Sequence, residues 1–244
     1  MDFSGRDVFV VGSAGALGSG LIAALTKAGA NVLGIDRVAD ATAADGLRLR
    51  SVDVLSDAEV GGLFDAEPVP WAVLNVVGGF AARRPLTQLD LDELESQLLL
   101  NLVTAALVTK HALRRMSEVG EGRLVHTASR VAFEPNGSGF AYSVSKLAVV
   151  HLVRMAATEV QGTGITVNCV VPSIVDTPAN RASMPNSDHT RWPAIAQVAA
   201  AYLFLASPAA QLISGAALPV YGRALEGTCV HPPTTGLRIS GIDI

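Results

Sequence analysis

Cysteine is nearly absent from this chain of 244 residues, which contains only Cys169 and Cys229. Two thiols exclude a disulfide framework and a cysteine-based metal site, and they favour a reducing cytoplasm as the compartment. Dense runs of Lys or Arg are also missing, because 18 basic residues stand against 22 acidic ones and give a net charge of -4. The chain therefore lacks the basic patch typical of a protein that binds nucleic acid.

Long apolar runs are missing as well. No uninterrupted apolar segment reaches the roughly eighteen residues that a membrane-spanning helix needs. The beginning of the chain, MDFSGRDVFVV, carries an acid at position 2 and only a short apolar stretch, which does not fit a signal peptide. The missing apolar run predicts no membrane partner. The histidines do not show the spacing of ligands on one helix face, so we also predict no metal site.

Half of the residues are hydrophobic and 16% are charged, which suits a parallel sheet that is buried on both faces. Apolar runs of strand length alternate with longer helical patterns, the rhythm of a doubly wound sheet. Strands are expected at residues 7–11, 31–35, 48–52, 72–76, 122–127, 166–171 and 217–220, and helices near 17–29, 57–66, 90–118, 140–161 and 195–206.

The pattern predicts an α/β fold: a single-domain, Rossmann-type, doubly wound parallel sheet of about seven strands with helices on both faces. This domain would span residues 1–222. Residues 178–193 lack clean periodicity and are interpreted as a substrate-side loop, and residues 223–244 as an irregular C-terminal arm.

A glycine-rich turn, GSAGALG at 12–18, follows the first expected strand directly and precedes a helix. Backbone without side chains can approach a pyrophosphate there, while the free amides and the dipole of the helix face it. The turn contains Gly12, Gly15, Ala16, Leu17 and Gly18. Its G-x-x-G-x-x-G spacing meets the general dinucleotide fingerprint only in part. The alternative is that the glycines simply permit close packing of helix and strand.

The second expected strand ends at Asp36, about twenty residues beyond the turn, where a carboxylate can accept the ribose hydroxyls of an adenosine. Such a carboxylate repels the 2'-phosphate of NADP and favours NAD. Arg37 follows at once and could receive that phosphate, so NADP stays possible. The third strand is followed by Asp53 and Val54, where the acid can meet the adenine amine or, alternatively, start a turn.

Tyr142 and Lys146 stand four residues apart in AYSVSK and therefore share one face of a helix. An ammonium near a phenol lowers the pKa of the phenol, which makes it a usable acid or base near neutral pH. The alternative is a packed Tyr beside a Lys that reaches out to solvent.

Two upstream residues favour the catalytic interpretation. Ser129 lies just past the end of an expected strand, where open α/β sheets place groups that bind ligands. Asn101 lies inside an otherwise apolar helix, where a buried amide needs partners. The alternatives are a turn or cap for Ser129 and a satisfied core amide for Asn101.

These motifs, together with LNVVGG at 74–79 and VVPSIVDTPAN at 170–180, resemble in order and spacing the short-chain dehydrogenase/reductase family over about residues 5–222. The resemblance implies a catalytic tetrad of Asn101, Ser129, Tyr142 and Lys146. Tyr142 would exchange a proton with the substrate oxygen and Ser129 would polarise it. Lys146 would lower the Tyr pKa and hold the nicotinamide ribose, and Asn101 would keep a water linked to Lys146.

The resemblance also implies further positions at the cofactor and an assembly. Asn75 and Gly78 would border the adenosine side of the cleft. Pro172, Ile174 and Thr177 would pass beside the nicotinamide. Apolar residues on more than one face of the helices at 90–118 and 140–161 suggest a second partner for burial, and the family implies a homodimer or homotetramer there.

The predicted function is an NAD(H)-dependent oxidoreductase, with NADP possible, that interconverts a carbonyl and a secondary alcohol on a small or medium substrate. The turn at 12–18 and the string at 175–192 are similar to the quinonoid dihydropteridine reductase branch, so reduction of a quinonoid pterin is the alternative. That branch lacks a serine at the Ser129 position, and a complete tetrad fits ordinary carbonyl chemistry better. A non-catalytic NAD(H) sensor is the third hypothesis.

Overall fold

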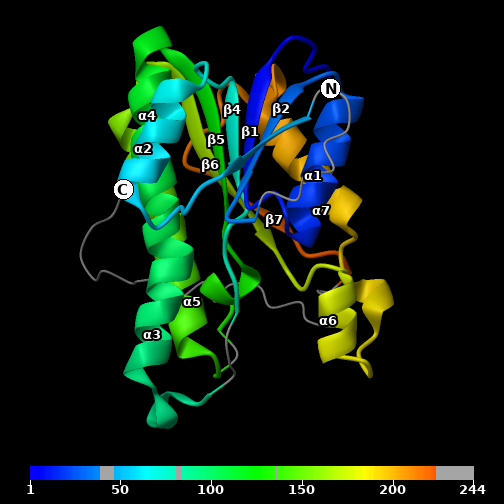
Figure 1. Ribbon diagram of the computed structural model, residues 1–244. Helices are drawn as coiled ribbons and strands as arrows, with labels where there is room; N and C mark the ends of the chain where they lie inside the picture. Colours follow the sequence, from blue (N-terminus) through cyan, green and yellow to red (C-terminus); the bar gives the residue numbers. More distant parts are fainter. Residues whose placement is uncertain (39–46, 81–83, 136, 224–244) are drawn as a thin grey trace, which may run out of the picture.

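Seven parallel strands form one sheet in the order β3-β2-β1-β4-β5-β6-β7. The computed structural model describes residues 1–38, 47–80, 84–135 and 137–223 (Figure 1). The strands are β1 Asp7–Val11, β2 Asn31–Asp36, β3 Leu47–Ser51, β4 Ala72–Asn75, β5 Glu121–Thr127, β6 Gly164–Pro172 and β7 Ala217–Val220. The strand order reverses between β1 and β4, and a crevice for ligands forms at the carboxyl edge of such a reversal. The predicted fold class is confirmed.

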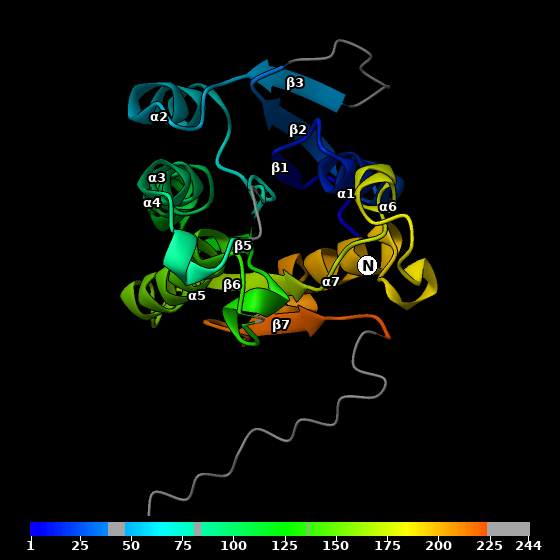
Figure 2. The same cartoon turned by 90° about the horizontal axis from the view of Figure 1, so that it is seen from below.

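Helices cover both faces of the sheet (Figure 2). One face is covered by α1 Ala16–Lys27 and α7 Ile195–Ala206, and the other by α2 Asp57–Ala66, α4 Thr104–Val119 and α5 Phe140–Glu159. Alternate residues of β1 enter the two cores, with Val8 and Val10 on the side of α1 and α7, and Phe9 and Val11 on the side of α2, α4 and α5. This alternation follows from the period of two in a strand and explains why β1 has buried apolar residues throughout.

The single helix predicted at 90–118 is interrupted. It consists of α3 Leu91–Leu98, a π-helical turn at Leu99–Val103 and α4. A π turn holds one residue more than an α turn and is frequent at functional sites. Asn101 lies in this turn and its carboxamide binds the main chain of Gly79, with 3.1 Å from Gly79 N to Oδ1 and 3.1 Å from Nδ2 to Gly79 O.

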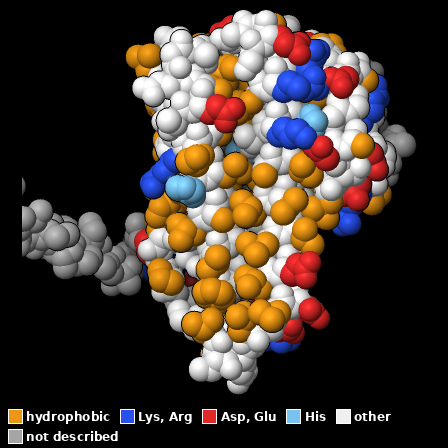
Figure 3. Space-filling model, turned by 90° about the vertical axis from the view of Figure 1, so that its left-hand side faces the viewer, with side chains coloured by type: hydrophobic (Ala, Val, Ile, Leu, Met, Phe, Trp, Pro, Cys, Tyr) orange, Lys and Arg blue, Asp and Glu red, His pale blue; other side chains and the backbone are white. Residues whose placement is uncertain are grey.

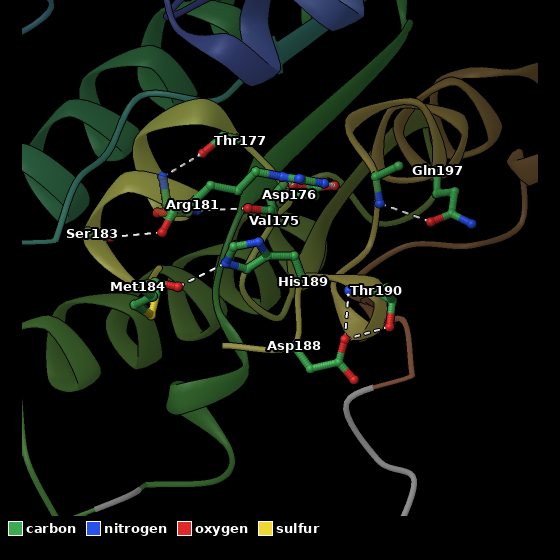
Figure 4. Close-up of polar contacts among 12 residues, drawn as sticks. Val175, Asp176, Thr177, Arg181, Ser183, Met184, Asp188, His189, Thr190 and Gln197 are labelled. Atoms are coloured by element: carbon green, nitrogen blue, oxygen red, sulfur yellow. Dashed lines mark hydrogen bonds and ion pairs between the residues drawn. The ribbon is translucent and has the colours of Figure 1, made fainter. Parts of the chain in front are cut away.

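The segment predicted as an irregular loop at 178–193 contains regular structure, so that prediction is partly wrong. It holds α6 Pro178–Ser183 and a 3-10 turn at His189–Arg191 (Figure 4). Thr177 caps α6 by accepting a hydrogen bond from Asn180 N, and proline occupies the first helical position, where its missing N–H costs nothing. Of the arm predicted at 223–244, the structure describes only Arg223.

Helix α5 is long and apolar enough, by length and composition, to cross a membrane. In the fold it packs against the sheet, with Val150, Val153 and Ala156 buried in the core shared with α4. Its Lys146 is also buried inside the protein. Core packing accounts for the apolar composition of this helix.

Candidate active site

The glycine-rich turn forms a tight cradle between β1 and α1. Gly12 has a φ of +92°, and a Cβ on Gly18 would lie 2.1 Å from Gly12 O. Gly15 is the N-cap of α1 and no side chain caps that end of the helix. The amides that begin α1 at Ala16 and Leu17 are therefore available to an anion, and the cradle fits the pyrophosphate of a dinucleotide.

Asp36 lies beside this turn at the end of β2. Its carboxylate accepts hydrogen bonds from Ala14 N at 3.0 Å and from Arg37 N at 2.8 Å. These bonds fix the carboxylate next to the cradle, where an adenosine ribose would extend from the pyrophosphate. Arg37, the next residue, is exposed.

Asp53 starts a turn, as the alternative interpretation expected. Its Oδ1 accepts from Leu55 N at 3.0 Å, and its carbonyl accepts from Ser56 N at 2.9 Å. Val54 is buried beneath it. The carboxylate remains exposed, so this turn also leaves it free to meet an adenine amine.

Ser129, Tyr142 and Lys146 come together at the carboxyl ends of β5 and β6. The Ser129 hydroxyl hydrogen-bonds the phenol of Tyr142. The Lys146 ammonium lies 5.9 Å from the Tyr142 ring centroid and donates to Thr127 O at 3.0 Å. A phenol, a hydroxyl and an amine thus converge from two elements on the crevice beside the glycine turn.

The pKa directions at this site differ from the sequence-based expectation. Burial raises the pKa of Tyr142, and the hydrogen bond from Ser129 opposes that rise. Burial also lowers the pKa of Lys146 to about 8, because an ammonium loses its hydration there. Lys146 points its charge at the carbonyl of Thr127 rather than at the phenol. The predicted lowering of the Tyr142 pKa by Lys146 is therefore not found in this structure.

Asn101 connects the π turn to the active-site loop and to α5. Besides its two bonds to Gly79, its Nδ2 lies 3.1 Å from Ser145 Oγ and 3.3 Å from Gln97 Oε1. Ser145 in turn donates to Tyr142 O at 2.8 Å. The side chain is therefore a junction between three segments, which is a fuller set of partners than the sequence indicated.

The position of Asn75 and Gly78 at the adenosine side of the cleft stays a prediction, and the structure shows what the two residues contact. Asn75 is 2% exposed and its side chain turns into the protein toward His126. Gly78 lies against the catalytic groups, since a Cβ there would be 2.6 Å from Asn101 Oδ1 and 2.7 Å from Lys146 Nζ. The loop after β4 thus contacts the catalytic groups through Gly78 and lies against the glycine turn through Val77.

The segment after β6 lies at the edge of the same crevice. Pro172 is the last residue of β6 and Ile174 follows it in a partly exposed bend. Thr177 Oγ1 is engaged in capping α6. Arg181 forms a bidentate ion pair with Asp176, with N–O distances of 2.5 and 2.8 Å, which ties α6 to the segment between β6 and α6 (Figure 4).

Sequence reasoning missed three features of the site. The Phe80 ring meets Tyr142 in a T-shaped contact at 5.2 Å. His126 is fully buried and binds Asn75 and Thr109. The main-chain carbonyl of Thr127 accepts a hydrogen bond from Lys146, and a contact with a main-chain carbonyl cannot be predicted from residue types. A polar residue inside the apolar pattern of β5 was the available signal for His126.

Within the described ranges, no group of three or more His, Cys, Asp or Glu is placed to hold a metal ion.

Comparison with known proteins places this geometry in a family. The family model described as enoyl-(acyl carrier protein) reductase matches residues 12–222. The structure of a short-chain type dehydrogenase/reductase from Mycobacterium ulcerans superposes with a TM-score of 0.85 at 27% identity, covering 93% of this chain and 92% of that one. The chain belongs to the short-chain dehydrogenase/reductase family.

Relatives in this short-chain dehydrogenase/reductase family act on different alcohols. Cis-4-hydroxycyclohexanecarboxylate dehydrogenase from Sinomonas cyclohexanicum is 33% identical over 240 residues, covering 90% of this chain and 96% of that enzyme. D-threitol dehydrogenase from Mycolicibacterium smegmatis is 29% identical, covering 89% of this chain and 92% of that enzyme. Membership in this family of oxidoreductases is shared, while the substrate varies among its members.

Proposed function

We propose that this short-chain dehydrogenase/reductase is an NAD(H)-dependent enzyme that interconverts a carbonyl and a secondary alcohol. The observation that carries the proposal is the convergence of Ser129, Tyr142 and Lys146 beside the glycine cradle. A hydroxyl bonded to a phenol, next to a buried amine, is the arrangement that proton transfer to a substrate oxygen needs. A protein that only bound nucleotide would have no use for it.

In the proposed reaction the Ser129 hydroxyl donates a hydrogen bond to the substrate oxygen and holds it near Tyr142. The raised pKa of Tyr142 keeps the phenol protonated at neutral pH, so that it can give its proton to the oxygen during reduction. The nicotinamide, when bound, supplies or accepts the hydride. Lys146 and the main chain around Thr127 position the helix that carries the phenol. In the direction of oxidation the same Tyr142 takes the proton back.

The cofactor assignment rests on Asp36. Its carboxylate is held next to the cradle by two main-chain amides. A negative charge at this position accepts ribose hydroxyls and repels a 2'-phosphate, so NADH is the expected partner and NADPH the weaker one. These hydrogen bonds prevent the Asp36 carboxylate from turning away from the cradle, which strengthens the preference for NADH over NADPH.

The substrate is expected to be small or medium in size and apolar near the reacting carbon. Phe80 is 50% exposed and stands edge-on to Tyr142. An exposed aromatic ring beside the proton donor offers an apolar wall to a ring or chain of carbon atoms. The alicyclic substrate named for the Sinomonas relative is consistent with this preference.

The decisive experiment measures nucleotide binding and turnover in parallel. NADH should bind more tightly than NADPH, and a panel of cyclic and linear ketones and alcohols should reveal turnover. Tyr142→Phe should lower kcat about 10³-fold, the middle of the range for a lost acid-base group, and leave NADH binding within about two-fold. Tyr221→Phe is the matched control, since it removes a phenol oxygen outside the reacting set and should keep full activity.

Each alternative has its own outcome in this experiment. Normal turnover by Tyr142→Phe would remove the proton-donor role. Turnover of a quinonoid pterin with none of the carbonyl panel would favour the pterin reductase. Tight NADH binding without turnover of any compound would favour the sensor.

We further propose that the protein works in the cytoplasm and that it forms a homodimer. The outer surface of α3, α4 and α5 would be the dimer interface. Figure 3 shows hydrophobic side chains gathered on this face. Its large exposed residues include Leu91, Leu99, Leu147 and Met155, which are between 40% and 71% exposed. An apolar face of this extent favours association. Sedimentation should give the mass of a dimer or of a multiple of it, and Met155→Glu should shift it toward the monomer; a monomeric parent would contradict the proposal.

A further inference from the structure

The buried side chain of His126 has no place in the proposed chemistry, yet it lies under the catalytic site. His126 is the penultimate residue of β5 and is 0% exposed. It pairs across the sheet with Asn75, the last residue of β4. Buried polar groups usually have at least one hydrogen-bond partner, and the partners of His126 show which segments it connects.

The hydrogen bonds around His126 fix its tautomer. Its Nδ1 lies 3.2 Å from Asn75 Nδ2, and its Nε2 lies 2.9 Å from Thr109 Oγ1. Asn75 Oδ1 already accepts from Val77 N at 3.1 Å, so the amide nitrogen of Asn75 faces the imidazole. An amide nitrogen only donates, and Nδ1 must therefore be the acceptor. The proton resides on Nε2 and is donated to Thr109.

The chain of bonds ends on helix α4. Thr109 Oγ1 accepts from Nε2 and donates to Ala105 O at 2.7 Å. The hydrogen bonds from Val77 through Asn75, His126 and Thr109 to Ala105 thereby all run in a single direction. Burial and the charge of Lys146 lower the pKa of His126 to about 3, so the imidazole stays neutral and this direction is stable at working pH.

The segment that this chain of bonds holds is the loop after β4. Val77 N lies at 3.0 Å from the position of a Cβ on Gly12, which means that the loop packs directly on the glycine cradle. On its other side, Gly78 packs on Asn101 and Lys146, and Gly79 is bonded to Asn101. A shift of this loop would therefore disturb the nucleotide cradle and the catalytic amine together.

We propose that His126 is a positioning residue, which relays the position of α4 through Thr109 and Asn75 to the loop at 76–79 and so sets the distance between the glycine cradle and Lys146. His126 acts only through Asn75 and touches neither the proposed substrate nor the reacting atoms. The kinetic part of this inference rests on the proposed function. The structural part does not.

Three variants test the relay. His126→Phe keeps a ring of similar size and removes both nitrogen contacts. Thr109→Val removes one hydroxyl with little change of volume, and it provides the test if His126→Phe folds poorly. Thr166→Val is the matched control, because Thr166 is a buried threonine at the other end of the sheet whose Oγ1 has no hydrogen-bond partner among the described residues.

Amide hydrogen exchange gives a readout that needs no activity. The Val77 amide should exchange about ten-fold faster in Thr109→Val and faster still in His126→Phe, because its acceptor on Asn75 is no longer held. In Thr166→Val its exchange should equal that of the parent. Ring-nitrogen NMR of His126 should show the proton on Nε2. Unchanged Val77 exchange in both relay variants, or a proton on Nδ1, would overturn the inference.

Kinetics separate positioning from general packing. In protein shown to be folded at the assay temperature, His126→Phe should lower kcat/KM about 10- to 100-fold and weaken NADH binding, since small misplacements are costly in active sites. A lower melting temperature with parental kcat, KM and NADH affinity would reduce His126 to a packing residue and contradict the proposal. A parent without turnover would count against the proposed function, and the exchange experiment would still decide the relay.

Discussion

The nucleotide half and the catalytic half of the crevice are built by different means. Around Gly12 and Gly18 the site is formed by main chain, and its shape depends on the absence of side chains. Around Asn101 and Lys146 it is formed by buried side chains that reach across several elements. The nucleotide half leaves no room for an added side-chain atom at these glycines. The catalytic half depends on hydrogen bonds that a substitution at any of several distant residues can break.

Adding one methyl group at Gly18 should distort the nucleotide half of the crevice and weaken nucleotide binding. In Gly18→Ala the new Cβ would meet Gly12 O at 2.1 Å, so the turn or the start of α1 must move. We expect a loss of about 1–3 kcal/mol in the free energy of unfolding, together with NADH binding that is at least ten-fold weaker. Calorimetry and fluorescence titration measure the two effects.

Gly62→Ala is the control for this change. Gly62 lies within α2, and a Cβ there would have no neighbour within 4 Å. Alanine is the better helix former by about 1 kcal/mol, so this variant should be more stable than the parent and bind NADH equally well. Similar behaviour of the two variants would show that the close approach at Gly18 does not matter.

Removing one charge from the nucleotide half should weaken the preference for NADH over NADPH. Asp36→Asn keeps the shape of the side chain and removes the repulsion toward a 2'-phosphate. The preference for NADH over NADPH should fall about ten-fold in titrations of the two nucleotides, the size of a modest charge interaction. Asp53→Asn, which removes an acid after the neighbouring strand, should leave the ratio unchanged; an equal shift would indicate a general effect of charge.

The two halves also differ in how far the sequence predicts them. The turn at 12–18 and Asp36 are local patterns, and the strand and helix between them were predicted nearly to the residue. The π turn at Leu99–Val103 was missed, and the contact that Asn101 makes from it with Gly79, 22 positions away in the chain, is not a local pattern. The relay through His126 was missed for the same reason. The order of Ser129, Tyr142 and Lys146 indicated the catalytic half only through the family resemblance.

Acid should weaken the catalytic half through His126. The imidazole of His126 has a pKa of about 3 in the folded protein and about 6.5 as an ordinary histidine, so the unfolded chain binds more protons between these values. Its contribution to stability is therefore complete above pH 6.5 and is lost as the pH falls, by about 1 kcal/mol per pH unit. Lys146 behaves as a second depressed group, with a pKa of about 8 against 10.5, and its burial penalty is relieved as the pH rises from 8 to 10.5.

Denaturant titrations of the parent and of His126→Phe between pH 7 and pH 5 isolate the His126 effect, because the two proteins differ only at this residue. The other histidines are common to the parent and His126→Phe, so the difference between the two proteins removes their contribution. The parent should lose stability more steeply than the variant on going to pH 5, and the curves should be parallel from pH 7 to pH 8. Parallel curves over the whole range would mean that His126 can take up a proton without disturbing Asn75, and that the catalytic half depends on its buried bonds less than its geometry indicates.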